Sequence, residues 1–163
     1  MNTQIHNMTR QTNSKRIIIS FVVAIHAFFF FTSNAAFANE ASPVITVYKS
    51  PTCGCCGKWV DHLKSQGFTV DAKNRNDLDS IKRELGIHPS VQSCHTAKIG
   101  KYIVEGHVPA EDIKRMIKEK PKIDGLAVPE MPMGSPGMEG NTKDDYNVLA
   151  IKQGENPTIY NSH

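Results

Sequence analysis

Three cysteines within four positions are the strongest chemical signal in the chain. Cys53, Cys55 and Cys56 follow an apolar run that ends in a Ser-Pro turn, and a helical pattern begins directly behind them. The amide groups and the dipole at a helix N-terminus favour an anion, so we expect Cys53 and Cys56 to have pKa values below the free value of about 8.5. Such thiolates suit thiol–disulfide exchange or the binding of a soft metal ion, which needs several thiolates close together.

The third cysteine favours metal binding, since a redox pair does not need it. A purely structural role is the alternative, because cysteines of exported proteins usually form disulfides. A bridge between the neighbours Cys55 and Cys56 would be strained, and a bridge within one turn closes only a short loop. We therefore interpret the cluster as chemical rather than structural.

His107 and three methionines are further candidates for metal ligands. His107 ends an expected strand in Glu-Gly-His-Val-Pro, where a lone histidine is a ligand, a surface residue or a satisfied core group. Met131, Met133 and Met138 lie in a stretch whose prolines forbid a helix. Thioether sulfur selects Cu(I), whereas the alternative role of these methionines is to fill gaps against the core.

Alternating strand and helix patterns must position these side chains. β-Branched or alternating runs predict strands, and apolar residues at helical spacing predict helices. The expected strands are 44–48, 68–72, 96–99, 102–105, 146–151 and 158–160, the expected helices are 54–66, 78–85 and 109–120, and 122–141 is an expected loop. A βαβ unit followed by ββα predicts an α/β, thioredoxin-like mixed sheet with a C-terminal Met/Pro/Gly loop and a terminal β-hairpin.

Cys94 lies just before the expected third strand, in Ser-Cys-His-Thr. In thioredoxin-like folds this position lies beside the CxxC pair and normally holds a cis-proline, which is absent here. We therefore expect Cys94 to face the other cysteines and to complete a set of four sulfur atoms. A packed, buried thiol is the alternative.

The first 38 residues have the layout of a cleavable secretory signal peptide. Basic residues precede the apolar run 17–31, and the small-x-small triplet 36–38 follows it. The run is shorter than the roughly 20 residues of a spanning helix, so we expect one domain over 39–163 and membrane contact only through the signal peptide before cleavage. The leader holds three of the 19 basic residues and none of the 16 acidic ones, which leaves 16 of each. This balance argues against a nucleic-acid partner.

Copper is the metal that this donor set favours, and zinc comes second. Sets of three or four cysteines suit tetrahedral zinc, but structural zinc sites usually use two separated ligand pairs. Three cysteines crowded at one helix end, together with methionines, better suit a thiolate-bound Cu(I). Silver is a further, less favoured ion.

Several segments resemble the exported CopG family of copper-resistance proteins, once a domain of unknown function: 48–56, 93–97, 104–109, 125–129, 131–132 and 134–138. The resemblance implies a thioredoxin-like fold in the periplasm of a Gram-negative bacterium, beside other copper or silver tolerance proteins. It also implies bound copper and a redox role between Cu(I) and Cu(II). The implied ligands are Cys53, Cys55, Cys56 and Cys94, supported by His107, Met131 and Met138, with Met133 as an extra.

Three functions follow as hypotheses. The first is a copper oxidoreductase that uses Cys53 and Cys56 as its redox pair, because two thiols can yield a disulfide and two electrons. The second is a copper chaperone or sink without turnover, and the third is a thiol–disulfide oxidoreductase. For the copper functions, the expected partners are copper ions and other periplasmic copper-efflux or copper-resistance proteins.

Overall fold

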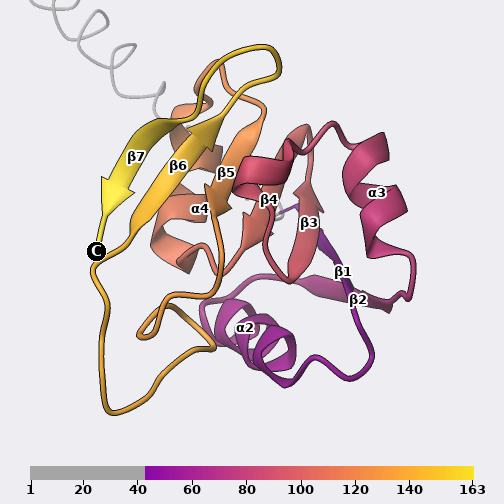
Figure 1. Ribbon diagram of the computed structural model, residues 1–163, viewed down its shortest axis with the longest axis vertical. Coiled ribbons are helices and arrows are strands. Elements are labelled where there is room, and N and C mark those ends of the chain that lie inside the picture. Colours follow the sequence, from indigo (N-terminus) through magenta and orange to yellow (C-terminus); the bar gives the residue numbers. More distant parts are fainter. Residues whose placement is uncertain (1–42) are drawn as a thin grey trace, which may run out of the picture. The chain divides into compact units, whose positions relative to one another are not determined.

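A single mixed sheet of seven strands runs through residues 43–163, the part of the chain that the computed structural model describes (Figure 1). The expected signal peptide lies outside these residues. The strand order is β2-β1-β3-β4-β5-β6-β7. The strands are β1 (Ile45–Lys49), β2 (Val70–Asn74), β3 (His95–Ile99), β4 (Tyr102–Gly106), β5 (Gly125–Val128), β6 (Asn147–Ile151) and β7 (Thr158–Ser162).

The strand pairing confirms the α/β class and the βαβ–ββα order. β1 pairs with β2 in parallel and with β3 in antiparallel orientation, and β3 pairs antiparallel with β4. β5 then adds to β4 in parallel, and the antiparallel hairpin of β6 and β7 extends the sheet further. The expected terminal hairpin is therefore a part of the main sheet.

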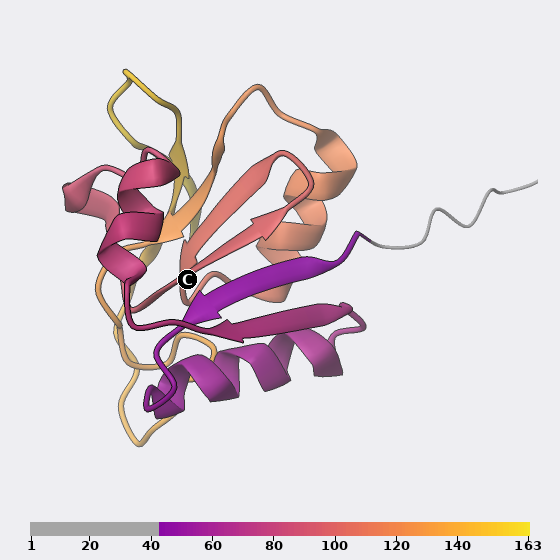
Figure 2. The ribbon, with the colours of Figure 1, turned by 90° about the vertical axis from the view of Figure 1, so that its right-hand side faces the viewer.

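The helices lie on both faces of this sheet. They are α2 (Gly54–Ser65), α3 (Leu78–Glu84), the 3₁₀ turn η1 (Pro89–Val91) and α4 (Ala110–Glu119). Figure 2 shows α3 and α4 on opposite sides of the sheet. Trp59 and Leu63 of α2 share one buried cluster with Ile113 and Met116 of α4, whereas Val91 of η1 belongs to a smaller one. None of the helices among residues 43–163 is long and apolar enough to cross a membrane.

The strand β5 corrects the expectation of a continuous loop over 122–141. All four of its residues are buried, and it pairs with strands on both sides. A Cβ at Gly125 would collide with the backbone of Ile103, so the glycine lets β5 pack closely against β4. Four buried residues beginning with glycine give no alternating pattern, which explains why the sequence did not reveal this strand.

Candidate metal centre

The four cysteines of the described chain meet where β1 passes into α2. Cys53 is the N-cap of α2, and its sulfur accepts a hydrogen bond from the amide of Cys56. Cys94 lies on the loop that enters β3, the antiparallel neighbour of β1. This neighbourhood brings the Sγ atoms of Cys53, Cys55, Cys56 and Cys94 within 4.8 Å of one another. We call these four residues the cysteine cluster.

The cluster contains one disulfide and two free thiols. Cys53 and Cys56 are joined, while Cys55 and Cys94 are free. The Sγ of Cys55 lies 3.5 Å from that of Cys53, and the Sγ of Cys94 lies 3.5 Å from that of Cys56. Two thiolates on one tetrahedral ion, each at about 2.3 Å, are about 3.8 Å apart. Opening the disulfide would therefore leave four sulfur atoms at separations close to those of metal ligands.

The thiol of Cys94 is partly buried and faces a histidine. Burial raises its pKa to about 12, and the neighbouring Cys55 thiol adds to the shift. The Nε2 atom of His107 lies 3.1 Å from the Cys94 sulfur. The other ring nitrogen of His107, Nδ1, donates to the Pro136 carbonyl at 2.8 Å, because a carbonyl can only accept. Nε2 is then the nitrogen with a free lone pair, and it faces the thiol.

The imidazole of His107 is fully buried, with no exposed surface. Burial lowers the pKa of His107, with only partial opposition from the Pro136 carbonyl. A neutral ring is the form that binds metals, and a second ring nitrogen fixed by a carbonyl is the usual arrangement around a metal-bound histidine. The structure thus places His107 beside the cysteine cluster in the form that a ligand requires.

His95 also lies at this site, although only its position next to Cys94 could have singled it out in the sequence. Its Nδ1 atom is 3.3 Å from the Cys94 sulfur. The ring is fully buried, with its centroid 4.3 Å from that of Trp59. Burial lowers the pKa of His95 well below its usual value, and the nearby His107 adds to this effect. His95 is therefore a second neutral imidazole at Cys94.

A buried charge network holds the loop that carries Cys94. The Glu105 carboxylate accepts from the Ser93 amide at 2.7 Å and from the Thr96 hydroxyl at 2.6 Å, and it pairs with the Lys82 ammonium. Lys82 is 3% exposed and Glu105 is fully buried. Because the Ser93 amide is the backbone group just before Cys94, this network anchors the cysteine to α3 and β4.

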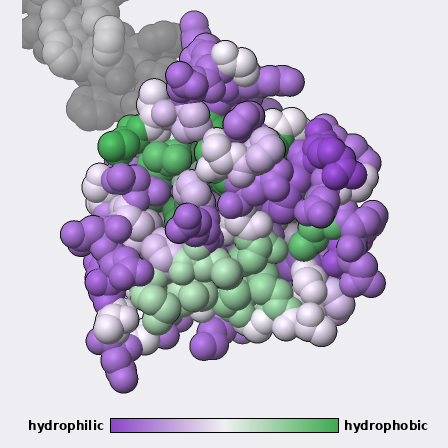
Figure 3. All heavy atoms as spheres, in the orientation of Figure 1, coloured by the Kyte–Doolittle hydropathy of each residue, from purple (hydrophilic) through white to green (hydrophobic). Residues whose placement is uncertain are grey.

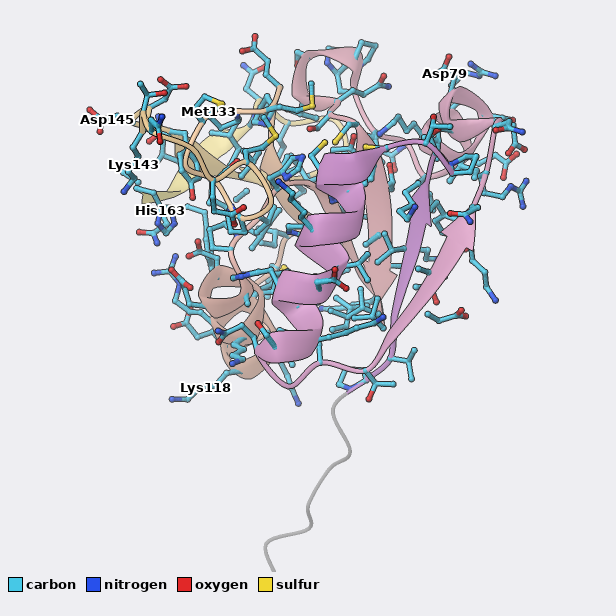
Figure 4. All side chains as sticks on the ribbon, turned by 90° about the horizontal axis from the view of Figure 1, so that it is seen from below. Asp79, Lys118, Met133, Lys143, Asp145 and His163 are labelled. Carbon is cyan, nitrogen blue, oxygen red and sulfur yellow. A yellow bond between two sulfur atoms is a disulfide. The ribbon has the colours of Figure 1, made fainter. Side chains whose placement is uncertain are left out.

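The methionine-containing loop, residues 129–146 between β5 and β6, covers the same end of α2. A Cβ at Gly137 would lie 2.7 Å from the Cys55 carbonyl and 3.3 Å from Nδ1 of His107, so the backbone there is in close contact with the site. Met138 follows Gly137 directly. In Figure 4, sulfur atoms gather at the end of α2 beside the loop that carries Met133.

The other end of this loop also contacts the site. Ser93 pairs with Glu130 in an isolated parallel bridge, and its hydroxyl donates to the Glu130 carbonyl. Met131 follows Glu130, and its side chain is 47% exposed. Figure 3 shows a weakly hydrophobic band over α2 and the neighbouring loop, on a surface that is otherwise mostly hydrophilic. Met131 and Met138 are therefore each one residue from a backbone contact with the cysteine cluster or its supporting loop, whereas Met133 is three residues from Glu130.

Four clustered cysteines, one of which also lies beside two buried imidazoles, define a cysteine-rich α/β protein with the donor groups of a metal centre. Comparisons with known proteins are consistent with this class. The family model described as "Protein of unknown function, DUF411" matches residues 91–138. A search of curated proteins gives no significant match.

Two solved structures are similar over most of the described chain. Both are of copper resistance protein CopG, in a form 1 and a form 2. Each is 39% identical to this chain with a TM-score of 0.71, and each match covers 75% of this chain and 98% of the other. The chain therefore belongs to the CopG family of copper-resistance proteins.

Proposed function

We propose that this protein binds copper in the periplasm as part of copper or silver tolerance, and that it holds Cu(I) on the four sulfur atoms of the cysteine cluster. The observation that carries the proposal is the convergence of four Sγ atoms within 4.8 Å at one helix N-terminus. Soft thiolates favour Cu(I), and the partial positive charge at the start of α2 favours the anionic thiolates. His107 and the thioethers of Met131 and Met138 support the site.

The disulfide gives the proposed site a redox function. Opening the Cys53–Cys56 bond takes up two electrons and yields two thiols after protonation, and closing it releases them. Two copper ions that each change between Cu(I) and Cu(II) balance this exchange. The Cys53–Cys56 pair is thus the electron reservoir of a copper oxidoreductase, whereas a copper chaperone or sink would bind the ion without using it.

A second candidate function is thiol–disulfide exchange, which the Cys53–Cys56 disulfide itself favours. In this reaction a thiolate attacks along the axis of the disulfide. For Cys94, attack in line on Cys56 would place its sulfur about 5.5 Å from that of Cys53, given an ordinary S–S bond. The sulfur atoms are instead all within 4.8 Å of one another, so Cys94 lies beside the bond. This compact grouping favours shared binding of an ion over a relay between these cysteines.

A Cu(I) titration of the reduced, oxygen-free protein against a coloured Cu(I) chelator tests the binding proposal. We expect tight uptake by the wild type and weaker uptake by Cys94→Ser, whereas Ser65→Ala at the far end of α2 serves as the matched control and should bind like the wild type. The absence of tight uptake by the reduced wild type would refute the proposal.

The redox function needs a separate measurement. Anaerobic addition of Cu(II) to the reduced protein should remove the Cu(II) signal from the electron paramagnetic resonance (EPR) spectrum. Two free thiols should disappear for every two ions reduced, because Cys53 and Cys56 supply the two electrons. Copper uptake without loss of the EPR signal or of thiols would identify a sink or chaperone instead.

A further inference from the structure

A second group of donor atoms lies beside the disulfide and does not include it. The Cys94 sulfur, one ring nitrogen of His95 and one of His107 lie within 4.8 Å of one another. The centroids of the two imidazole rings are 5.0 Å apart, and the rings meet edge to face. While Cys53 and Cys56 are joined, their sulfur atoms cannot act as thiolates, but this second group keeps all its donors.

The separations within this group match those of ligands around one ion. A thiolate sulfur at about 2.3 Å and an imidazole nitrogen at about 2.0 Å from a tetrahedral ion are about 3.5 Å apart. The Cys94 sulfur lies 3.1 Å from Nε2 of His107 and 3.3 Å from Nδ1 of His95. The two sulfur–nitrogen separations therefore differ from those of a metal site by only a few tenths of an ångström, and the two imidazole nitrogens lie within 4.8 Å of each other.

His95 is a buried imidazole whose Nδ1 is turned toward the Cys94 sulfur. Its ring lies against Trp59 with no exposed surface, and its Nε2 has no hydrogen-bond partner among the described residues. The nitrogen that faces the cluster is Nδ1, 3.3 Å from the Cys94 sulfur. With no ion present Nδ1 can share the thiol proton of Cys94, and an ion that displaces this proton would meet a neutral nitrogen beside the thiolate.

We propose that Cys94, His95 and His107 form a second copper site, a His₂Cys site that binds Cu(II) while Cys53 and Cys56 are joined in the disulfide. One thiolate with two imidazoles is the ligand set of trigonal copper sites used in electron transfer. The proposal rests on the proposed copper function and assigns the oxidised ion its own ligands, next to the sulfur cluster that takes the reduced ion. It also gives His95 a metal-binding role.

Cu(II) titration of the disulfide form of a Cys55→Ser variant tests this site, because Cys94 is then the only free thiol among residues 43–163. We expect one Cu(II) per chain, with a strong visible absorption from thiolate-to-copper charge transfer. The EPR spectrum of protein labelled with ¹⁵N-histidine should show coupling to two imidazole nitrogens. Co(II), which does not oxidise thiols, should give the corresponding thiolate charge-transfer band.

Single substitutions identify the ligands. Cys94→Ser should abolish the charge-transfer bands, and His95→Gln or His107→Gln should weaken Co(II) binding at least about tenfold, since the loss of even an outer-shell partner costs that much. His62→Gln is the matched control: His62 accepts a hydrogen bond from the Ala110 amide, is half-buried, and should leave metal binding unchanged.

The number of imidazole nitrogens coupled to Cu(II) in the EPR spectrum tests the proposal even if His95→Gln does not fold. This number is measured on protein that retains both His95 and His107. Coupling to one imidazole, or a His95→Gln variant that folds and binds Co(II) like His62→Gln, would overturn the proposal. These results leave Cu(I) uptake by the reduced protein unaffected, so failure of the His₂Cys site is distinguishable from failure of the proposed function.

Discussion

Replacing Lys82 with methionine should destabilise the protein by about 3–4 kcal/mol at pH 7. The change keeps most of the side-chain volume but leaves the fully buried Glu105 without its cation. Removing one partner of a buried ion pair costs about 3–5 kcal/mol. The carboxyl group can escape by taking up a proton, and holding a glutamate with an ordinary pKa of about 4.3 protonated at pH 7 costs about 4 kcal/mol. The cost of protonating Glu105, about 4 kcal/mol, is therefore the upper limit of the stability loss caused by Lys82→Met.

The same reasoning fixes the pH dependence of this loss. Burial raises the pKa of Glu105 in the folded protein, so folding favours the protonated, neutral carboxyl group. The stability that this preference contributes declines as the pH rises above the pKa of Glu105 in the unfolded chain. At pH 5 the cost of keeping Glu105 protonated falls to about 1 kcal/mol. Lys82→Met should therefore be much less destabilising at pH 5 than at pH 7.

Urea unfolding followed by far-ultraviolet circular dichroism at both pH values measures the effect, with the wild type measured at each pH as the reference. The double variant Lys82→Met/Glu105→Gln is the control, because it removes both charges and should recover most of the loss. A loss below about 1 kcal/mol at pH 7, or an equal loss at pH 5 and pH 7, would refute the assignment of a buried ion pair beneath the Cys94 loop.

Three further predictions concern copper and the methionine-containing loop. Reduction of the Cys53–Cys56 disulfide should raise the Cu(I) capacity by about one ion per chain in a chelator competition assay; equal capacity in both states would contradict the sulfur site. The pKa of the Cys94 thiol is raised to about 12, so a Cu(I) ion that binds to its sulfur must displace a proton. A plot of log Cu(I) affinity against pH should therefore be less steep for Cys94→Ser than for the wild type, by about one log unit per pH unit between roughly pH 6 and 9. An unchanged slope would exclude Cys94 as a ligand. Gly137 has φ +90°, and a Cβ there would lie 2.7 Å and 2.9 Å from backbone atoms of α2. The matched control is Gly154→Ala, since Gly154 has a similar φ of +79° but no atom within 4 Å of the added Cβ. Urea unfolding should show Gly137→Ala to be about 2 kcal/mol less stable than this control, and equal losses of stability would show that the loop does not pack tightly against α2.

The local parts of the site were predictable from the sequence because they depend on neighbouring residues. A strand that ends in a turn before a helix places Cys53 at the N-cap and Cys56 in the first turn, as the structure has them. The α/β order also followed from local patterns. Cys94 needed knowledge of a fold in addition, since only the pairing of β1 with β3 brings it across from the first helix.

The remaining features depend on contacts between distant segments. Lys82 lies on a short helix and reads as a solvated side chain, yet its ammonium meets Glu105 of β4 in the interior. The unpaired nitrogen and full burial of His95 likewise come from packing against Trp59 and His107. A sequence pattern shows which residues are polar, but it does not show which of them the fold will enclose together.

The position of Trp59 has an optical consequence. It is the single tryptophan of the chain, its indole nitrogen donates to the Val108 carbonyl at 2.9 Å, and its ring stacks at a tilt on His95. All tryptophan fluorescence therefore arises from one rigid environment at the wall of the cysteine cluster. A paramagnetic ion bound there would quench this emission, so the protein contains its own reporter of metal occupancy and needs no attached dye.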